Sequence, residues 1–151
     1  MLRVVLVYPE IPPNTGNIAR TCAATQTELH LVEPLGFEIS DRYLKRAGLD
    51  YWPYVNLHTH ASWPAFEAVQ GQQGGRVVSF STSGTQNYLQ FQFQADDWLV
   101  FGSESSGLPS DILQGSAAVL RIPINRQVRS LNLSVSAAVG LFEARRQVAI
   151  S

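Results

Sequence analysis

The 151-residue sequence contains one cysteine, Cys22, one lysine, Lys45, and few charged residues of either sign. A single cysteine excludes a disulfide within the chain and is typical of a reducing compartment. The net charge of -1 excludes a global basic field that would attract nucleic acid from a distance, although a local basic patch remains open. No apolar run approaches the roughly 20 residues that span a membrane, and Arg3 interrupts the apolar start where a signal peptide would lie. We therefore expect a cytoplasmic protein.

The composition is that of a globular protein, since hydrophobic residues make up 45% of the chain and charged residues 15%. A chain of this length is about the usual size of one domain. No internal repeat, linker or low-complexity tract interrupts it. We therefore expect a single domain over residues 1–151.

Apolar runs that resemble strands alternate with amphipathic segments along the chain. The pattern predicts strands at 3–8, 28–33, 54–59, 76–81, 98–102 and 118–123, and helices at 16–25, 41–47, 62–70, 109–114 and 132–147. Nearly continuous apolar strands in such an alternation indicate the α/β class, with a mostly parallel sheet flanked by helices. Residues 83–97 are predicted to be irregular, although their segment "LQFQFQ" alternates like an edge strand.

The segment "FGSESSGLPS" (101–110) is the densest cluster of small residues and invites three interpretations. A hydrolase nucleophile elbow needs the pattern Gly-x-Ser-x-Gly, and its first glycine is missing here. The three histidines that could partner a serine, His30, His58 and His60, lie in or near strands of the first half of the chain. A phosphate loop needs a lysine after its glycines, and the dinucleotide pattern Gly-x-Gly-x-x-Gly is absent. What remains is either a plain turn or, because ligands bind at the carboxyl ends of strands, a site where the backbone at Gly102 approaches a ligand.

Two further polar clusters also begin where an apolar strand stops. In "YPEIPPNTGNIARTCAA", Asn14 or Thr15 can cap a helix, and Arg20 follows in its second turn. In "RIPINRQVRSLNLSVSAA", Ser130 or Asn132 can cap the final helix, and capping alone would explain both residues. Three such strand ends on one side of a sheet would build one pocket. The small residues of the last helix suit close packing, either within the chain or against a second copy.

Four motifs, "PEIPPNTGNIARTCAAT", "DRYLKRAGLDYW", "FGSESSGLP" and "RIPINRQVRSLNLSVSAAV", occur in an order and spacing that resemble the SPOUT superfamily of methyltransferases. Within it, the chain from Met1 to Gln147 resembles the small tRNA (cytidine/uridine-34)-2'-O-methyltransferase family, and "KRAGLDYW" separates that family from its relatives. The resemblance implies a SPOUT-type sheet with a C-terminal deep trefoil knot, which pattern alone would not predict because knots are almost absent from proteins. It also implies a homodimer with an active site shared between chains.

The resemblance further implies that S-adenosylmethionine is the cofactor, with S-adenosylhomocysteine as the product and no metal involved. The positions that match its binding residues are Phe80, Gly102, Ile122, Ser130 and Leu131. Arg20, Ser130 and Asn132 match residues with catalytic roles in related families. Arginine stays protonated and is a poor general base, so we expect Arg20 to hold the phosphate next to the reacting hydroxyl. The expected reaction is 2'-O-methylation of the wobble nucleotide of leucine tRNAs.

The partner implied is the tRNA anticodon stem-loop. Arg129 matches an arginine that is linked to tRNA binding in the family, and Arg20 is also expected to contact the RNA. Arg42, Lys45 and Arg46 would add a basic face that contacts the phosphate backbone. For these last three residues, a solvated helix face without a binding role is the alternative. Gln26 stands where relatives commonly have glycine, and Phe142 where they often have tyrosine. Two other functions remain open: the same chemistry on another RNA such as ribosomal RNA, and a module that binds RNA or a nucleotide without catalysis.

Overall fold

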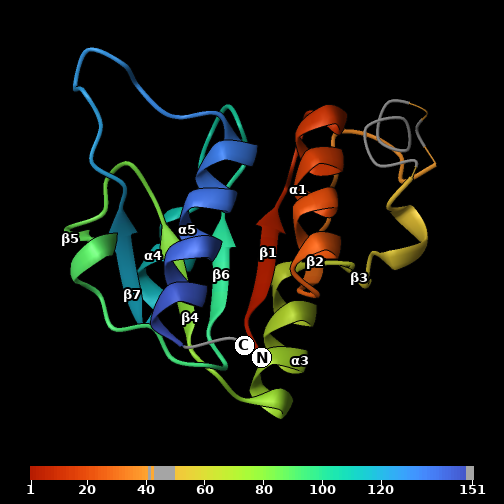
Figure 1. Ribbon diagram of the computed structural model, residues 1–151, viewed down its shortest axis with the longest axis horizontal. Helices are drawn as coiled ribbons and strands as arrows, with labels where there is room; N and C mark the ends of the chain where they lie inside the picture. The colour runs from red at the N-terminus through yellow and green to blue at the C-terminus, as the bar shows by residue number, and fades with distance from the viewer. Residues whose placement is uncertain (41, 43–49, 149–151) are drawn as a thin grey trace.

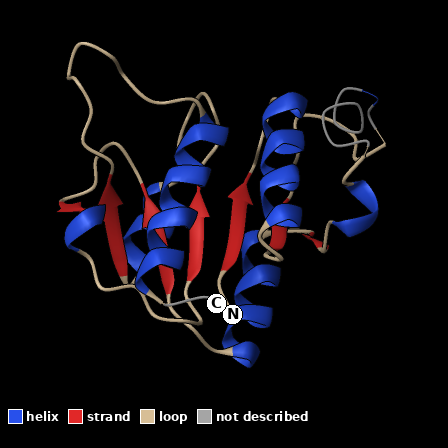
Figure 2. Cartoon of the chain, viewed as in Figure 1, coloured by secondary structure: helices blue, strands red, loops and turns tan. Residues whose placement is uncertain are grey.

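The computed structural model describes residues 1–40, 42 and 50–148, and its centre is a seven-stranded sheet of order β3-β2-β1-β6-β4-β7-β5. The strands are β1 (Arg3–Val7), β2 (Glu28–Val32), β3 (Leu57–His60), β4 (Val77–Phe80), β5 (Gln86–Asn87), β6 (Trp98–Phe101) and β7 (Ala118–Arg121). Every pair of neighbouring strands in this sheet is parallel, and the arrows of the central strands β1, β6, β4 and β7 point the same way in Figure 2. The α/β class and the mostly parallel sheet predicted from the sequence are therefore confirmed.

Helices cover both faces of the sheet (Figure 1). They are α1 (Pro12–Ala24), α3 (Trp63–Gln73), α4 (Ser110–Gly115) and α5 (Leu133–Gln147), with short 3-10 helices η1 (Trp52–Tyr54) and η2 (Tyr88–Gln90). One apolar core lies between the sheet and α1 with α5, where Ile18, Cys22 and Leu141 are buried. A second core lies on the opposite face, where Phe66 of α3 and Ile112 of α4 pack against β1 and β6. Among the helices of the described residues, none has the length and apolar character needed to cross a bilayer.

The strand register aligns the carboxyl ends of three central strands. Phe80, the last residue of β4, is paired with Phe101 of β6 and with Leu120 of β7. The chain leaves each of these strands on the same side of the sheet, and the long loop from β7 to α5 rises above that edge in Figure 1. This arrangement places the second and third polar clusters of the sequence beside each other.

Most predicted bounds lie within three residues of the observed ones, and the start of α1 and the position of β3 differ most clearly. Helix α1 begins at Pro12 rather than at residue 16, and its N-cap is Ile11, not Asn14 or Thr15. Proline suits the first turn of a helix because its missing N–H has no partner there in any case, and its fixed φ is helical. The strand predicted at 54–59 is shifted to Leu57–His60, because residues 52–54 form η1. The helix predicted at 41–47 lies outside the described residues apart from Arg42.

Residues 83–97 are largely irregular, as predicted. The alternation of "LQFQFQ" reflects burial without strand pairing, since Phe91 and Phe93 pack into the core and are 9% and 7% exposed. Gln26, in the turn before β2, has a φ of 53°, a left-handed conformation that favours glycine. Gln26 therefore adopts a backbone conformation that suits the glycine expected at this position from the resemblance.

The small-residue face of α5 packs within the chain. A Cβ atom at Gly140 would lie 2.8 Å from the Phe80 ring and 3.2 Å from the Phe101 ring. Ala137 and Ala144 are buried on the same face. The close contact predicted for this helix is thus made with the sheet, while Val135 and Phe142, both about half exposed, lie away from it.

Candidate cofactor and RNA site

A pocket of about 740 Å³ lies at the carboxyl ends of β4, β6 and β7. Its walls come from the three strand ends, the loop 102–108, the loop 122–132 and the first turns of α1 and α5. Of the residues predicted from the sequence, it brings together Phe80, Gly102, Ile122, Arg129, Ser130, Leu131 and Asn132. Its volume is within the usual range for pockets that hold a cofactor or another small ligand.

The loop after β6 folds back on itself, and this requires its glycines. The backbones of Ser103 and Gly107 exchange hydrogen bonds of 3.3 and 3.0 Å, and Gly107 has a φ of 65°. A Cβ atom at Gly102 would lie 2.1 Å from the backbone carbon of Gly107. The packing of the loop against itself therefore requires a glycine at position 102, as the plain turn considered from the sequence would; close approach of a ligand stays a prediction. Gly107 turns the chain as expected.

The serines of this loop have structural partners. The Ser105 hydroxyl and backbone N–H both donate to Oε1 of Glu10, at 2.6 and 2.9 Å. These two hydrogen bonds lower the pKa of the Glu10 carboxyl. Ser103 accepts a hydrogen bond from the Ser106 backbone N–H. A serine nucleophile with a histidine partner is not formed here, since the three histidines cluster on β2 and β3.

Glu104 caps the beginning of α1 from another part of the chain. Its carboxylate accepts hydrogen bonds from the backbone N–H groups of Glu10 and Ile11, at 2.9 and 2.8 Å, and from the Asn14 side chain at 3.2 Å. Helix α1 has no side-chain cap of its own, and a carboxylate at a helix N-terminus satisfies the free N–H groups and interacts favourably with the helix dipole. With the bonds between Glu10 and Ser105, this fixes the loop after β6 against the loop after β1.

Asn132 continues this network into α5. Its side-chain oxygen accepts a hydrogen bond of 2.8 Å from the Ser134 backbone N–H and so caps the helix, while its amide nitrogen donates to Asn14 Oδ1 at 3.1 Å. Of the two caps predicted from the sequence, Asn132 is the one formed. Because both ends of the amide are engaged, Asn132 is suited to hold the pocket in shape. Ser130 is exposed on the pocket wall.

The apolar part of the pocket is formed by side chains of unequal burial. The Phe80 ring is 7% exposed and stacks on the Phe101 ring, with 4.7 Å between ring centroids. The Phe80 side chain therefore belongs mainly to the core, and the residue lines the pocket as the last residue of β4. Ile122 and Leu131 are half-buried and face the same space. Together they form apolar walls beside backbone groups that have left the sheet.

Arg20 does not line this pocket. It is exposed on α1, and its guanidinium carbon lies 4.4 Å from the centre of the Tyr51 ring, a cation–π contact. Six residues separate it from Asn14, which does line the pocket, so it lies about 9 Å further along the helix axis. Within one chain, the structure thus leaves the predicted catalytic arginine apart from the predicted cofactor residues.

Of the remaining predicted RNA-binding residues, the structure describes Arg129 and Arg42. Arg129 is exposed at the pocket, in the loop before α5. Arg42 is exposed in the connection between β2 and β3. Lys45 and Arg46 lie outside the described residues.

The sequence matches a known protein family over most of its length. The model of the SpoU rRNA Methylase family matches residues 1–142. The chain belongs to the SpoU methylase family. The resemblance to the SPOUT superfamily seen in the four motifs is thereby confirmed.

Three similar proteins place the chain within the SpoU methylase family. A protein of Synechocystis sp. (strain ATCC 27184 / PCC 6803 / Kazusa), provisionally named tRNA (cytidine(34)-2'-O)-methyltransferase, is 59% identical, with 98% of this chain and 97% of that protein covered. A solved structure from work on the 2-OH methylation of C/U34 on tRNA is 49% identical, with a TM-score of 0.93 and 97% and 95% of the two chains covered. An AdoMet-bound rRNA methyltransferase from Sinorhizobium meliloti is 28% identical, with a TM-score of 0.90 over 99% of this chain and 57% of that one.

Two residues of the site were not predicted. Asn14 was considered only as a helix cap, and the role of Glu104 was left open. The sequence contains no local signal for either, because Pro12 and Pro13 have no N–H groups and the backbone N–H groups that Glu104 binds, those of Glu10 and Ile11, precede the helix. Which acceptor these N–H groups find depends on the fold, since Glu104 and Asn14 are 90 residues apart.

Proposed function

We propose that the chain is an S-adenosylmethionine-dependent methyltransferase that methylates the ribose 2'-hydroxyl of the wobble nucleotide, cytidine or uridine, in leucine tRNAs. The observation that carries the proposal is the pocket at the ends of β4, β6 and β7, which collects the cofactor residues named by the sequence motifs. Similarity over nearly the whole chain to a protein studied for C/U34 methylation supports the substrate.

The pocket suits this cofactor chemically. The half-buried Ile122 and Leu131 can flank a planar adenine, and backbone groups at Gly102 and Leu131 can bind its polar edge and the ribose hydroxyls. S-adenosylmethionine supplies, when bound, a methyl group already activated on a sulfonium. Ser130, exposed on the wall, is placed to bind the polar end of the ligand or the incoming ribose. S-adenosylhomocysteine would leave from the same pocket.

For the transfer, the protein has to hold the 2'-hydroxyl in line with the methyl group and to ease the loss of its proton. We assign Arg20 to the phosphate next to the reacting ribose, because a guanidinium binds phosphate oxygens with two parallel hydrogen bonds. Asn132 holds the first turn of α5 against Asn14 and thereby positions Ser130 and Leu131. No metal ion has a part in this scheme.

A homodimer with a shared active site would bring Arg20 to a pocket. The arginine does not line the pocket of its own chain, so a second copy has to present it. Helix α5 has an exposed apolar stripe, with Val135 47% and Phe142 49% exposed, that suits such a contact. The RNA would then meet residues of both chains, with Arg129 at the pocket and Arg42, Lys45 and Arg46 as a backbone-binding face.

We propose that residues 1–151 form one SPOUT domain whose last part, from β6 to α5, is threaded as a deep trefoil knot. The strand order β6-β4-β7 supports this. Strands β6 and β7 follow one another in the chain but lie on either side of β4, so the chain passes across β4 to connect them. Helix α5 then packs against the rings of Phe80 and Phe101. A tRNA substrate and the single buried Cys22 suit the cytoplasm.

Methyl transfer to separated RNA fractions tests the substrate. The protein is incubated with labelled S-adenosylmethionine and, in parallel, with total tRNA or ribosomal RNA from a strain that lacks the enzyme. We expect label in the tRNA fraction. Label confined to ribosomal RNA would favour the alternative suggested by the rRNA methyltransferase of S. meliloti. Calorimetry with S-adenosylmethionine tests the non-catalytic alternative, because a module without a cofactor pocket releases no heat of binding.

A further inference from the structure

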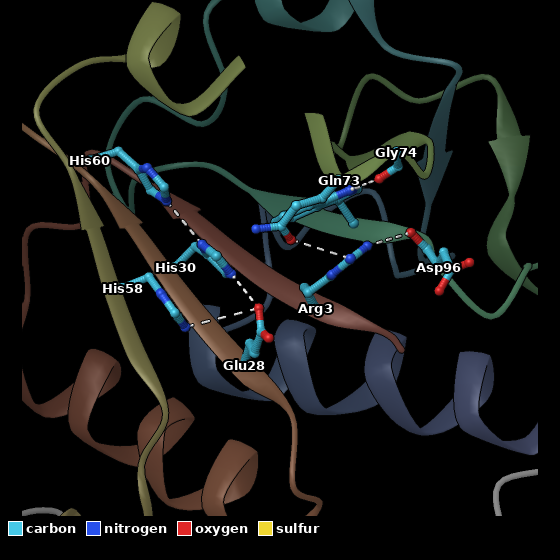
Figure 3. A network of polar contacts seen from close by, with 9 residues as sticks. Arg3, Glu28, His30, His58, His60, Gln73, Gly74 and Asp96 are labelled. Carbon is cyan, nitrogen blue, oxygen red and sulfur yellow. Dashed lines mark hydrogen bonds and ion pairs between the residues drawn. The ribbon is translucent and has the colours of Figure 1, made fainter. Parts of the chain in front are cut away.

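Four side chains that the methyl transfer does not use gather on one face of two neighbouring strands. Glu28 and His30 lie on β2, and His58 and His60 on β3. The register pairs His30 with His58 and Val32 with His60, and alternate residues of a strand share a face. Figure 3 shows the three imidazole rings and the Glu28 carboxylate turned toward one another.

The contacts within this cluster are close. His30 Nε2 lies 2.9 Å from Glu28 Oε1, and His30 Nδ1 lies 2.9 Å from His60 Nε2. His58 Nε2 lies 4.0 Å from the same Glu28 oxygen. One ligand atom each of Glu28, His30 and His58 lies within 4.8 Å of the other two. Three potential metal ligands therefore surround one point.

His30 is the most deeply buried side chain of the cluster. It is 1% exposed and makes edge-on ring contacts with Phe66 and Trp98. Both of its ring nitrogens have partners within the cluster. Imidazole nitrogens and carboxylate oxygens are ligands that divalent transition-metal ions commonly take.

We propose that Glu28, His30 and His58 form a binding site for one divalent transition-metal ion, with zinc as the ion that fits best. Two imidazoles and a carboxylate are a common zinc ligand set, which leaves the fourth position for water. Ligand atoms about 2.0 to 2.2 Å from a tetrahedral ion lie roughly 3.3 Å apart. The separations of 2.9 and 4.0 Å lie on either side of that spacing.

His60 would fix the orientation of His30. A histidine bound to a metal through Nε2 usually donates its Nδ1–H to a neighbouring acceptor, and His60 Nε2 is in place to accept it. In the metal-free protein, His30 Nε2–H instead donates to Glu28, and His60 donates to His30. Metal binding thus exchanges one pair of neutral tautomers for another without changing the number of protons on the two rings.

One movement is required. The rings of His30 and His58 are stacked, with 4.6 Å between centroids and 11° between planes, whereas a ligated metal lies in the plane of each ring. His58 has to turn about its own side-chain bonds, and it is free to do so because its side chain is 43% exposed. That exposure, with 21% for Glu28, also provides a path for the ion. The guanidinium of Arg3 stays outside the ligand set, since it donates to the backbone of Asp96 and to Gln73.

The site lies at the β3 edge of the sheet, away from the cofactor pocket at β4, β6 and β7. Its ligands come from both strands that flank the connection carrying Arg42 and Tyr51, the residue stacked on Arg20. An ion bound there would tie these strands together and hold the base of that connection. It would have no part in methyl transfer itself.

Zinc titration of the untagged full-length protein, stripped of metal by a chelator, tests this site. We expect calorimetry to give one zinc per chain, cobalt to give the visible absorption of a four-coordinate complex, and zinc to raise the melting temperature. In His58→Gln and Glu28→Gln, zinc affinity should fall at least tenfold. Glu67→Gln, which removes an exposed carboxylate of α3, should bind zinc as the wild type does.

Circular dichroism of the metal-free variants shows whether each has folded, and both changed residues are partly exposed, so we expect melting temperatures near that of the wild type. If a variant melts earlier, absence of the zinc-induced rise that the wild type shows still supports the site. Less than one zinc per wild-type chain, or equal affinity in the wild type and both variants, would overturn it. Metal-free protein should still bind S-adenosylmethionine and methylate tRNA, so failure here is distinct from failure of the proposed function.

Discussion

Arg20 is the residue on which the proposed chemistry depends most. Its flat guanidinium lies over the Tyr51 ring while the side chain stays exposed, and an ammonium group has neither the flat face nor the paired N–H groups of arginine. We predict that Arg20→Lys lowers kcat for tRNA about a hundredfold, because the reacting hydroxyl is misplaced. Affinity for S-adenosylmethionine, measured by calorimetry, should change little since Arg20 does not line the pocket.

The matched control is Arg146→Lys, an exposed arginine at the opposite end of α5 from the pocket. It should keep both properties. If Arg20→Lys lost cofactor affinity and turnover to the same extent, the assignment of Arg20 to the RNA phosphate would be wrong.

Glu104 shows how a polar residue at the pocket can act through the backbone. Its carboxylate caps α1 and holds Asn14, which in turn holds Asn132. We predict that Glu104→Gln destabilises the protein by about 1–2 kcal/mol, because an amide caps a helix less well than a carboxylate and places an N–H group near the N–H groups of the helix start. Thermal unfolding should show a melting temperature lower by roughly 2–8 °C.

Glu67→Gln serves as the control for the loss of a carboxylate and should melt with the wild type. An unchanged melting temperature in Glu104→Gln would show that the cap is not a source of stability.

At the scale of elements, the loop 102–107 contains a glycine that two different causes could require. Gly102 can be needed for the packing of the loop or for close approach of the cofactor, and the sequence alone does not distinguish the two. A Cβ atom at Gly102 would meet the backbone of Gly107, whereas one at Gly115, the last residue of α4, has no atom within 4 Å. We predict that Gly102→Ala costs about 1–3 kcal/mol through overpacking and weakens S-adenosylmethionine binding at least tenfold by displacing the pocket wall. Denaturant unfolding and calorimetry measure the two effects.

Gly115→Ala provides the comparison, since it adds the same methyl group where there is space. It should bind cofactor normally and be at least as stable as the wild type, because alanine is favoured over glycine in helices. Equal behaviour of the two variants would show that the close approach at Gly102 has no consequence.

Most elements were predictable because their apolar residues recur with a clear period, as in the buried strands β1 and β6. The errors arose where local rules compete. Pro12 and Pro13 suggest a stiff loop, yet they form the first turn of α1. The β3 prediction began too early because Tyr54 and Val55 favour strands, while Trp52 to Tyr54 form a 3-10 turn. The alternation at Phe91 and Phe93 reflects burial at the sheet edge rather than pairing.

The pocket was predictable in outline for a different reason. Parallel strands place their carboxyl ends at one edge of a sheet, so three polar clusters after strands indicate one site, and the structure brings two of them together with Asn14 of the first. Long-range partners were not predictable, since nothing local links Glu104 to Ile11 or Asn132 to Asn14. The separation of Arg20 from the pocket also depends on the position of α1 over the sheet.

At the scale of the whole molecule, the distance between Arg20 and the pocket of its own chain makes a dimer necessary for the mechanism that we propose. We predict that the wild type is a dimer by sedimentation velocity, and that Phe142→Glu, which places a charge in the apolar stripe of α5, dissociates it and abolishes methyl transfer. Leu89→Glu, at a residue 55% exposed on η2, should remain dimeric and active. A monomeric wild type with full activity would exclude a shared site.

The central claim is that this pocket directs a methyl group to the wobble ribose. The most direct measurement incubates the protein and S-adenosylmethionine with total tRNA from a strain lacking the enzyme, digests purified isoacceptors, and maps the new ribose methyl groups by mass spectrometry. The account predicts 2'-O-methylation at the wobble cytidine or uridine of leucine tRNAs, formed about a hundredfold more slowly with Arg20→Lys. Methylation at any other nucleotide, or on a base, would contradict it.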